Sequence, residues 1–259
     1  FKETAGERPT VTEERQAELF AVVKDLVSRY INTEVGEKAV EQLRTRYQVS
    51  TTDHHGPITH PFFANSHLVQ SLVNEKYKHS CIFVFSVGGV SLNNSSFPRG
   101  FFFHDENLKD VRLPFFSLRC RHHPVRNLPC FRESDLEALL AGIERKRDLP
   151  EKTKEKLKQF LRDVCLSPRL FSAQDYSEQI TLMNYNLWKR LPGQENTDLI
   201  YIEQEEVAAN LLTRYHLGYD TMISRLLADE SWLLAFEKYF DGVTGAFSSK
   251  IRHCTMLFW

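Results

Sequence analysis

The sequence predicts an α/β protein with a parallel-sheet core of the nucleotide-binding kind, an N-terminal helical pair and a helix-rich C-terminal half. The run 80–92 (SCIFVFSVGGVSL) is apolar and β-rich, which is typical of a strand buried on both faces of a parallel sheet. A short β-branched segment and a helical pattern precede this run, in the order of a β-loop-α-β unit. Helical patterns dominate the chain from residue 134 onward.

The segment 1–47 is predicted to form two helices ahead of the core. Apolar residues of 19–31 recur at helical spacing after a capping-box pattern between Thr10 and Glu13. A weaker apolar stripe continues over 40–47. We expect this helical pair to precede the sheet.

The segment 48–202 is predicted to be the α/β core, with helices inserted between its strands. Turn-rich residues and capping signals separate the elements. We expect strands at 48–52, 80–92, 101–105, 113–118 and 198–202, and helices at 61–73, 134–147, 149–166 and 172–191.

The segment 203–259 is predicted to be a C-terminal helical segment. Helical patterns cover 203–216, 220–228 and 231–240, and the apolar residues 254–259 predict a final strand. Aromatic residues of 231–240 lie at helical spacing, which favours a role in packing.

Composition restricts the partners of the chain. The sequence has 33 Lys and Arg against 34 Asp and Glu, a net charge of -1, so no overall field attracts nucleic acid or an anionic membrane. The longest apolar run, 81–90, is shorter than the roughly 18 residues that span a bilayer. Five scattered cysteines are typical of reduced thiols. We therefore expect a cytoplasmic protein without a membrane or nucleic-acid partner.

A histidine-rich loop follows the first predicted strand. Asp53, His54, His55 and His60 lie within eight residues, at the end of a strand where open α/β sheets bind ligands. These four are the candidate catalytic residues, with an imidazole as general acid, base or charge stabiliser and Asp53 orienting it. The turn at Gly56 presents backbone N–H groups that would bind an anion.

The same four side chains support a second interpretation. Imidazole and carboxylate together suit zinc or iron, so Asp53, His54, His55 and His60 are also candidate metal ligands. A bound metal would activate water or dioxygen, as in a metal-dependent hydrolase or oxygenase. The triplet Asp53-His54-His55 is similar to the signature of the phosphoesterases named for it, although no Asp-x-Asp motif of that family precedes it.

A second polar loop and a basic segment complete the predicted site. The loop follows the buried strand, and the basic segment lies within 112–132. Arginine binds carboxylate and phosphate bidentately, so these side chains would hold the anion of a small-molecule substrate. The candidate substrate-binding residues are Gly56, Asn93, Asn94, Ser95, Ser96, Arg99, Arg119 and Arg121.

The segment 52–63 (TDHHGPITHPFF) resembles the early motif of the cysteine-adding ligase family of bacillithiol synthesis, Thr-Gly-Gln-Gln-(x)-Gly-x-x-Thr-Gly-Pro. With one residue omitted, Thr52, Gly56, Thr59 and Pro61 coincide with that motif. The resemblance covers only this segment. It implies a nucleotide-binding fold with ATP or another nucleotide as cofactor.

Through that family the loop is also similar to the His-x-Gly-His element of nucleotidyltransferases and class I synthetases. His54-His55-Gly56 matches the first part, and Pro57 stands where the final histidine would be. The resemblance implies that the histidines bind phosphate and stabilise the transition state of a transfer reaction.

Three functions remain open from the sequence. The first is an enzyme, ligase-like or transferase-like, that acts on an anionic or nucleotide-activated small substrate. The second is the metal-dependent hydrolase or oxygenase. The third is a non-catalytic interaction protein that uses its exposed helices. We favour an enzyme because three histidines close together are costly in a plain turn, and the residues do not decide between nucleotide and metal.

Overall fold

The computed structural model describes residues 12–45, 49–52, 54–58, 61–77, 80–92, 100–105 and 107–240. The predicted strand at 254–259 lies outside the described residues. The chain divides into two compact units, Phe1–Val207 and Ala208–Trp259. None of the helices in the described ranges is long and apolar enough to cross a membrane.

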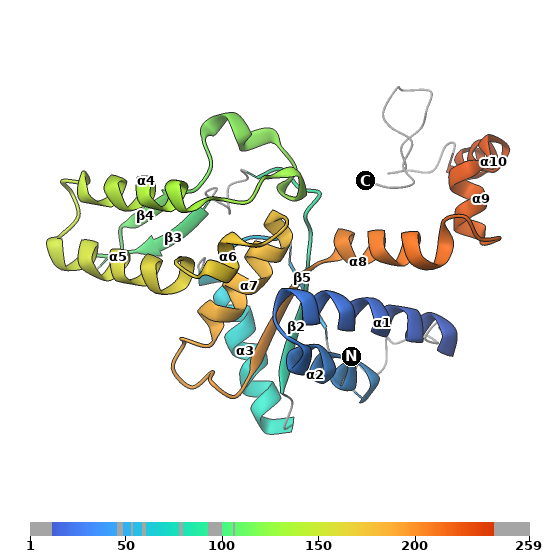
Figure 1. Ribbon diagram of the computed structural model, residues 1–259, viewed down its shortest axis with the longest axis horizontal. Coiled ribbons are helices and arrows are strands. Elements are labelled where there is room, and N and C mark those ends of the chain that lie inside the picture. Colours follow the sequence, from blue (N-terminus) through green and yellow to red (C-terminus); the bar gives the residue numbers. More distant parts are fainter. Residues whose placement is uncertain are drawn as a thin grey trace. The chain divides into compact units, whose positions relative to one another are not determined.

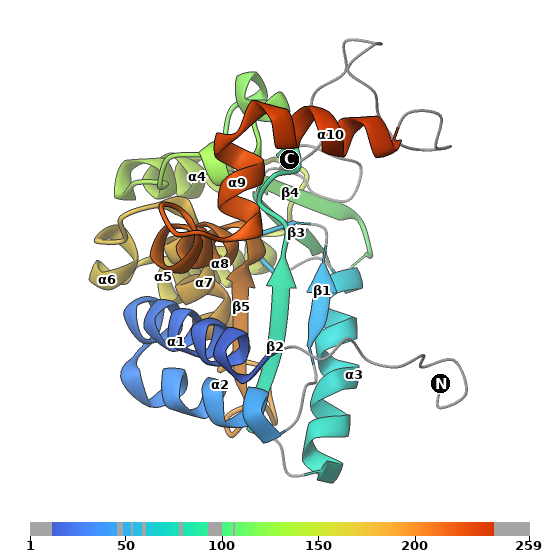
Figure 2. The same ribbon diagram turned by 90° about the vertical axis from the view of Figure 1, so that its right-hand side faces the viewer.

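Three parallel strands form the sheet of the first unit. They are β1 (Ser50–Thr52), β2 (Cys81–Ser86) and β5 (Asp198–Glu203), in the order β1-β2-β5. In the register of the sheet, Val84 lies opposite both Ser50 and Tyr201. Figure 2 shows the three arrows side by side and pointing the same way. The predicted α/β class and the parallel pairing of the buried run are confirmed.

Helices cover both faces of this sheet, which explains why β2 is apolar throughout. Figure 1 shows α1 and α2 on one side of β2 and β5, and α3 and α7 on the other. Ile82 and Val84 belong to the cluster of buried side chains that includes those of α7. Phe83 alternates with them and therefore points to the opposite face, where it is also buried.

The predicted N-terminal helical pair is confirmed as α1 (Glu13–Tyr30) and α2 (Thr33–Thr45). Thr12 caps α1, because its side chain accepts a hydrogen bond from the Arg15 backbone N–H. Gln42 of α2 binds the start of β2: its amide N–H donates to the Cys81 carbonyl at 2.6 Å, and its oxygen accepts from the Cys81 N–H at 2.8 Å.

The other face of the sheet is covered by α3 (Pro61–Tyr77) and α7 (Tyr176–Trp188). The Asp175 side chain caps α7 by accepting a hydrogen bond from the Glu178 N–H. Thr181 of α7 donates to the Tyr201 carbonyl at 2.8 Å, which fastens the helix to β5.

The prediction that two further strands extend the parallel core is wrong. β3 (Gly100–His104) and β4 (Asp110–Pro114) form a separate antiparallel sheet. The predicted strand at 113–118 ends at Pro114, and Leu118–His122 (η1) forms a 3-10 turn. A short connection between two strands favours antiparallel pairing, because a parallel partner needs a longer crossover.

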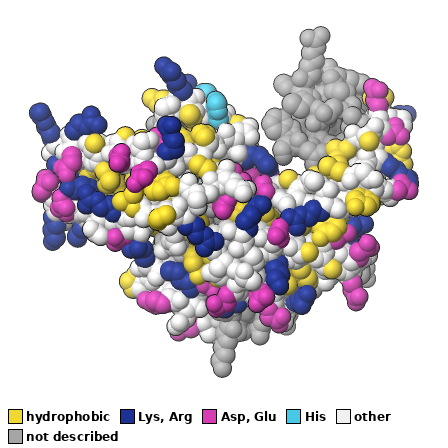
Figure 3. Space-filling view, viewed as in Figure 1, with side chains coloured by type: hydrophobic (Ala, Val, Ile, Leu, Met, Phe, Trp, Pro, Cys, Tyr) yellow, Lys and Arg dark blue, Asp and Glu magenta, His cyan; other side chains and the backbone are white. Residues whose placement is uncertain are grey.

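The remaining helices lie on either side of β5 in the chain. In the first unit, α4 (Glu133–Glu144) packs on α5 (Glu151–Cys165), and α6 (Pro168–Phe171) precedes α7. α8 (Gln204–Leu211) follows β5 directly and continues as a π-helical turn, Leu212–His216. The second unit contains α9 (Met222–Ala228) and α10 (Glu230–Phe240). On the face drawn in Figure 3, acidic and basic side chains are interspersed, as the balanced composition leads us to expect.

Candidate functional site at the carboxyl edge of the sheet

The carboxyl ends of the three parallel strands bring polar residues from distant parts of the sequence together. The segment 54–58 follows β1, the segment 87–92 follows β2, and Glu203 is the last residue of β5. Ser177, in the first turn of α7, contributes from the helix layer. Open α/β sheets bind ligands at this edge, which makes it the candidate site.

His55 is completely buried at this edge, and both of its ring nitrogens have partners in the chain. Nδ1 lies 2.6 Å from the Ser86 hydroxyl, and Nε2 lies 3.0 Å from the Ser177 carbonyl oxygen. The Ser86 hydroxyl also donates to the Ile202 carbonyl at 3.2 Å, and the Ser177 hydroxyl lies 3.3 Å from Nε2, so both serines link the ring to the chain. Burial lowers the pKa of His55 to about 4, so the ring is neutral at neutral pH.

Tyr201 of β5 supports both histidines. Its ring stacks on that of His55 with the centroids 5.6 Å apart, and its hydroxyl donates to the His54 carbonyl at 2.6 Å. The His54 ring is also buried, with Nε2 3.0 Å from the Ser91 carbonyl oxygen. Both predicted histidines are therefore packed inside the edge by the residues around them.

Gly56 belongs to the same packed segment. Asn184 of α7 donates from its amide to the Gly56 carbonyl at 2.9 Å and accepts from the Ile58 N–H at 3.1 Å. The loop after β1 is thus held to α7 by a pair of buried hydrogen bonds.

The two glycines after β2 form an anion-binding turn that the chain fills itself. The Glu205 carboxylate accepts from the Gly88 N–H at 2.8 Å and from the Gly89 N–H at 2.7 Å. Successive backbone N–H groups of this kind bind phosphate in other proteins. In this structure the position is taken by a carboxylate from α8.

Glu203 is the most unusual group at the edge. Its side chain is 1% exposed, and the Ser177 side chain and the Arg126 guanidinium are the neighbours that favour its charged form. Burial raises the pKa of Glu203 to about 7, although Arg126 favours the charged form. The Arg126 guanidinium lies 3.5 Å from Glu203 Oε1, at ion-pair distance. A β-carbon at Gly88 would lie 2.3 Å from the carboxyl carbon, so only glycine fits there.

Backbone pairing brings the basic segment to this edge. The Leu92 N–H donates to the His123 carbonyl at 2.9 Å, and the Arg126 N–H donates to the Gly88 carbonyl at 2.8 Å. η1 precedes His123 and carries Arg119 and Arg121, both exposed. These bonds join the segment 87–92 to the segment 123–126, which follows the arginines in the chain.

Several predicted site residues lie outside the described residues. They are Asp53, His60, Asn93, Asn94, Ser95, Ser96 and Arg99. Of the predicted site residues that the structure describes, His54, His55 and Gly56 lie at one edge of the sheet. The backbone hydrogen bond between Leu92 and His123 lies beside them.

The metal interpretation can be compared with the described residues only in part, because Asp53 and His60 are not among them. Within the described ranges, the one group of three or more side chains arranged to hold an ion is Glu144, Glu151 and Glu155, all exposed. Lys158 pairs with Glu144 and Glu155, and Lys154 pairs with Glu151, so these carboxylates are already neutralised.

Sequence reasoning missed Glu203, Ser86 and Ser177. The signal for the first two was a polar residue at the end of an apolar strand, IYIE for Glu203 and CIFVFS for Ser86. Ser177 had no comparable signal, because its part in the site depends on how α7 packs.

Comparisons with known proteins add no relative. No protein-family model matches the chain, and no curated protein and no solved structure matches it either. The functional argument therefore rests on the residues of this edge.

Proposed function

We propose that the chain is an enzyme that acts on a small anionic substrate at the carboxyl edge of the sheet, with Glu203 taking up or giving the proton. The proposal is carried by the Glu203 carboxylate, which is 1% exposed and whose pKa burial raises to about 7 although Arg126 and Ser177 favour its charged form. Desolvating a carboxylate is costly, and strongly perturbed carboxyl groups in such positions concentrate at functional sites.

The pKa of Glu203 suits general acid–base catalysis. With a pKa of about 7, the carboxyl group is present in both protonation states near neutral pH. A group in this condition can accept a proton in one step and return it in another. His55, with a pKa of about 4, remains neutral over the same range.

We place the anion of the substrate near Arg119 and Arg121, at the carboxyl edge of the sheet. The Gly88 and Gly89 N–H groups are occupied by Glu205, so they do not offer a free position. Arg119 and Arg121 are exposed next to the loop after β2, and their guanidinium groups suit carboxylate or phosphate.

His54 and His55 are given positioning roles in this proposal. Their rings contact Ser91, Ser86 and Ser177 of the chain. Such contacts fix the strand ends against α7 and thereby hold the surroundings of Glu203. More specifically, the enzyme would be a ligase or transferase that uses ATP or another nucleotide. The alternative is zinc or iron chemistry at Asp53, His54, His55 and His60.

Thermal shifts with a panel of anions test the proposal directly. The panel contains ATP, other nucleoside phosphates, sugar phosphates and dicarboxylates, and metal content is measured on protein purified without a histidine tag. We expect one class of anion to raise the unfolding temperature of the wild type, and Arg119→Gln with Arg121→Gln to remove that shift. Glu203→Gln should retain the shift but fail to form the product that mass spectrometry detects with the wild type.

Three results would count against the proposal. If no anion on the panel stabilised the protein, the substrate class would be wrong. If Glu203→Gln turned over the substrate at the wild-type rate, Glu203 would not be the proton carrier. Stoichiometric zinc or iron that is lost in His60→Ala would favour the metal-dependent alternative instead.

One observation favours a second function, that of an interaction module. Large apolar side chains on and before α9 and α10 are exposed in the second unit, Tyr239 by 83%. Exposed apolar side chains gathered on one short helical pair are typical of a surface that binds another protein. They are Leu217, Tyr219, Met222, Leu227, Trp232, Leu234 and Tyr239.

A further inference from the structure

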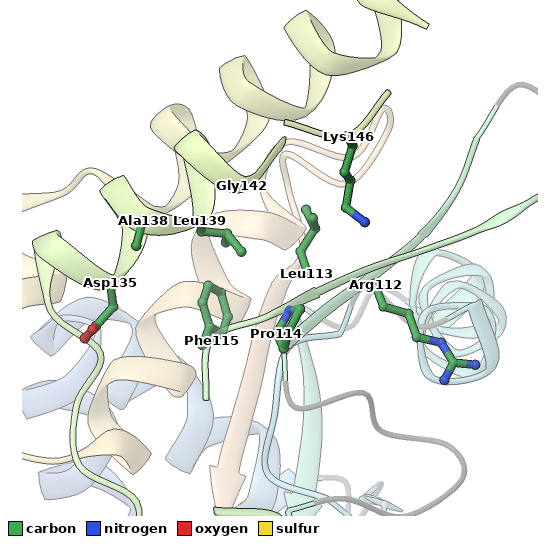
Figure 4. Close-up of a pocket in the computed structure, with 9 residues that line it drawn as sticks. All are labelled: Arg112, Leu113, Pro114, Phe115, Asp135, Ala138, Leu139, Gly142 and Lys146. Atoms are coloured by element: carbon green, nitrogen blue, oxygen red, sulfur yellow. The ribbon is translucent and has the colours of Figure 1, made fainter. Parts of the chain in front are cut away.

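A cavity of about 530 Å³ lies between β4 and α4, in the first unit. Figure 4 shows side chains of the strand and of the helix on its two sides. Its volume lies within the range of about 300–1,000 Å³ that is typical of small-molecule sites. The lining residues are Arg112, Leu113, Pro114, Phe115, Asp135, Ala138, Leu139, Gly142 and Lys146.

The middle of the cavity is apolar. Leu139 of α4 and Phe115, which follows β4, lie between the charged lining residues in Figure 4. The Phe115 ring stacks on the buried Phe131 with centroids 4.8 Å apart, so it is fixed in position. An apolar ligand body would replace water over these side chains, which is favourable.

Gly142 keeps the helix side of the cavity open. It lies inside α4, where glycine costs about 0.5–1 kcal/mol relative to alanine. A β-carbon at this position would have no atom within 4 Å, and the backbone there does not require glycine. The residue therefore leaves space in the cavity that a larger side chain would fill.

The charged groups are separated along the cavity. In Figure 4, Lys146 lies at one end and Asp135 at the other, and the Arg112 guanidinium points away from Leu139 and Phe115. The Asp135 carboxylate is already used, because it accepts from the Arg132 N–H at 2.7 Å and pairs with the Arg132 guanidinium at 3.5 Å. The free charge of the cavity is thus positive.

Lys146 supplies most of that free charge. Its ammonium has no hydrogen bond or ion pair within the described ranges, and the side chain is half-buried. Two backbone carbonyls near the end of α4 already accept hydrogen bonds from side chains other than Lys146. Arg145 donates to the Ala141 carbonyl, and Lys154 donates to the Glu144 carbonyl. Arg112 points to the face of β4 opposite to the buried Leu113, where its guanidinium lies over the Phe102 ring, 5.8 Å from the centroid, and 3.5 Å from Asp110.

We propose that this cavity binds a small amphiphilic carboxylate. The carboxylate lies at the Lys146 end, and the apolar body lies over Leu139 and Phe115. A cation is disfavoured because Asp135 is paired, and a neutral ligand would leave the Lys146 ammonium without a partner. The site is separate from the proposed catalytic edge and does not depend on the function assigned there.

Titration calorimetry with 2-naphthoate and with 2-naphthamide tests the proposal. The two probes share the apolar body and differ in charge. We expect naphthoate to bind the wild type, and naphthamide to bind about tenfold more weakly because it cannot form a charge-assisted hydrogen bond with Lys146. No measurable naphthoate binding, or equal affinities for the two probes, would overturn the proposal.

Gly142→Leu tests the place of binding. The leucine side chain would enter the cavity, so naphthoate affinity should fall at least about tenfold while the helix gains propensity. Gly142→Ala fills little of the space and serves as the matched control, with affinity close to the wild type. Unchanged naphthoate binding by a folded Gly142→Leu protein would place the probe elsewhere and overturn the assignment.

Lys146→Gln provides an independent test that does not change the cavity shape. This variant should bind naphthoate as weakly as naphthamide, and naphthamide affinity should not change. Lys156→Gln, on an exposed position of α5, is the control and should leave both affinities unchanged. If Lys146→Gln retained the preference for naphthoate, the proposed anion position would be wrong, whether or not Gly142→Leu folds.

Discussion

Three buried ionisable side chains near the sheet differ in how their polar atoms are satisfied. His55 has partners for both ring nitrogens, whereas His67 of α3 has none among the described residues. Glu203 has Arg126 at ion-pair distance, yet burial still raises its pKa to about 7. A buried polar group without a partner and a desolvated carboxylate both lower stability, so the cost of His67 and Glu203 should be measurable by substitution.

Glu203→Gln is expected to stabilise the protein at high pH. The pKa of Glu203 is raised to about 7 in the folded protein, above the ordinary 4.5. As pH rises from 4.5 to 7, the unfolded chain loses this proton first, so the wild type loses stability relative to the neutral glutamine variant. The difference in free energy of unfolding should grow over this range and reach about 3 kcal/mol above pH 7.5.

Urea unfolding of both proteins at several pH values measures this difference. Glu137→Gln, at an exposed position of α4, is a suitable control because its carboxylate is in solvent. A constant difference between wild type and Glu203→Gln from pH 4.5 to 8 would show that the carboxyl group titrates normally. The proposed proton carrier would then lose its main support.

His67→Leu should also increase stability. The ring of His67 packs edge-on against Trp188 and Tyr201, and burial lowers the pKa of His67 to about 4. Leucine is similar in size and needs no hydrogen bond, so we expect a gain of about 1 kcal/mol at pH 7. Below pH 6.5 the His67 ring is protonated in the unfolded wild type but not in the folded protein. The stability gained by His67→Leu should therefore increase as the pH falls.

Unfolding of His67→Leu at pH 7 and at pH 5 checks both parts of this expectation. His104→Leu, at an exposed position of β3, should change stability by less than about 0.5 kcal/mol. A loss of stability at pH 7 would indicate that the His67 ring binds a group that the described residues do not include.

At the scale of elements, paired amide hydrogen bonds join helices to the strands and loops of the sheet. Gln42 holds α2 to the first residue of β2, and Asn184 holds the loop after β1 to α7. Each side chain supplies a donor and an acceptor to one stretch of backbone. These contacts specify which helix lies over which strand end, in addition to the apolar packing.

Gln42→Ala should therefore cost about 2–3 kcal/mol of stability, because the Cys81 N–H is left buried without its partner. The Cys81 carbonyl still accepts a hydrogen bond from the Asn74 amide at 2.7 Å, which limits the loss of stability. Glu41→Ala, an exposed neighbour on α2, is the control and should change stability by less than about 0.5 kcal/mol. A loss as small as that of the control would mean that packing alone fixes α2 on the sheet.

Elements with a strong local pattern could be predicted from the sequence. The run 81–85 is apolar, and the burial of this strand on both faces follows directly from that pattern. The antiparallel pairing of β3 and β4 could have been predicted from their short connection, but the aromatic pattern alone fits either a parallel or an antiparallel partner. Their separation from the main sheet depends on packing against α5, where Phe101 and Phe103 contact Phe160.

The site was predictable only in outline. A polar loop after a strand indicated the carboxyl edge, and His54 and His55 lie there. The sequence could not indicate that their rings bind chain atoms, since Ser177 is 122 residues away from His55. Glu203 was missed because an acidic residue at a strand end is ordinary until its burial is known.

At the scale of the whole molecule, the two units differ in how much they bury. The first unit contains the buried residues of the sheet and its helices. In the second unit, none of the residues of 208–240 whose side chains the structure describes is buried. Apolar burial is the main source of stability, so the second unit has less to stabilise it within the described residues.

Hydrogen exchange of the intact chain should reflect this difference. β2 is the central strand of the sheet, and β5 is an edge strand that pairs with it. Their residues pair from Cys81 opposite Asp198 to Ser86 opposite Glu203. We expect the amides of both strands to exchange only through global unfolding of the first unit, whereas amides of α9 and α10 should exchange at least about a hundredfold faster through local opening. Mass spectrometry of peptic fragments after deuteration measures both. Equal protection of α9, α10 and β2 would show that contacts outside the described residues stabilise the second unit as strongly as the sheet stabilises the first.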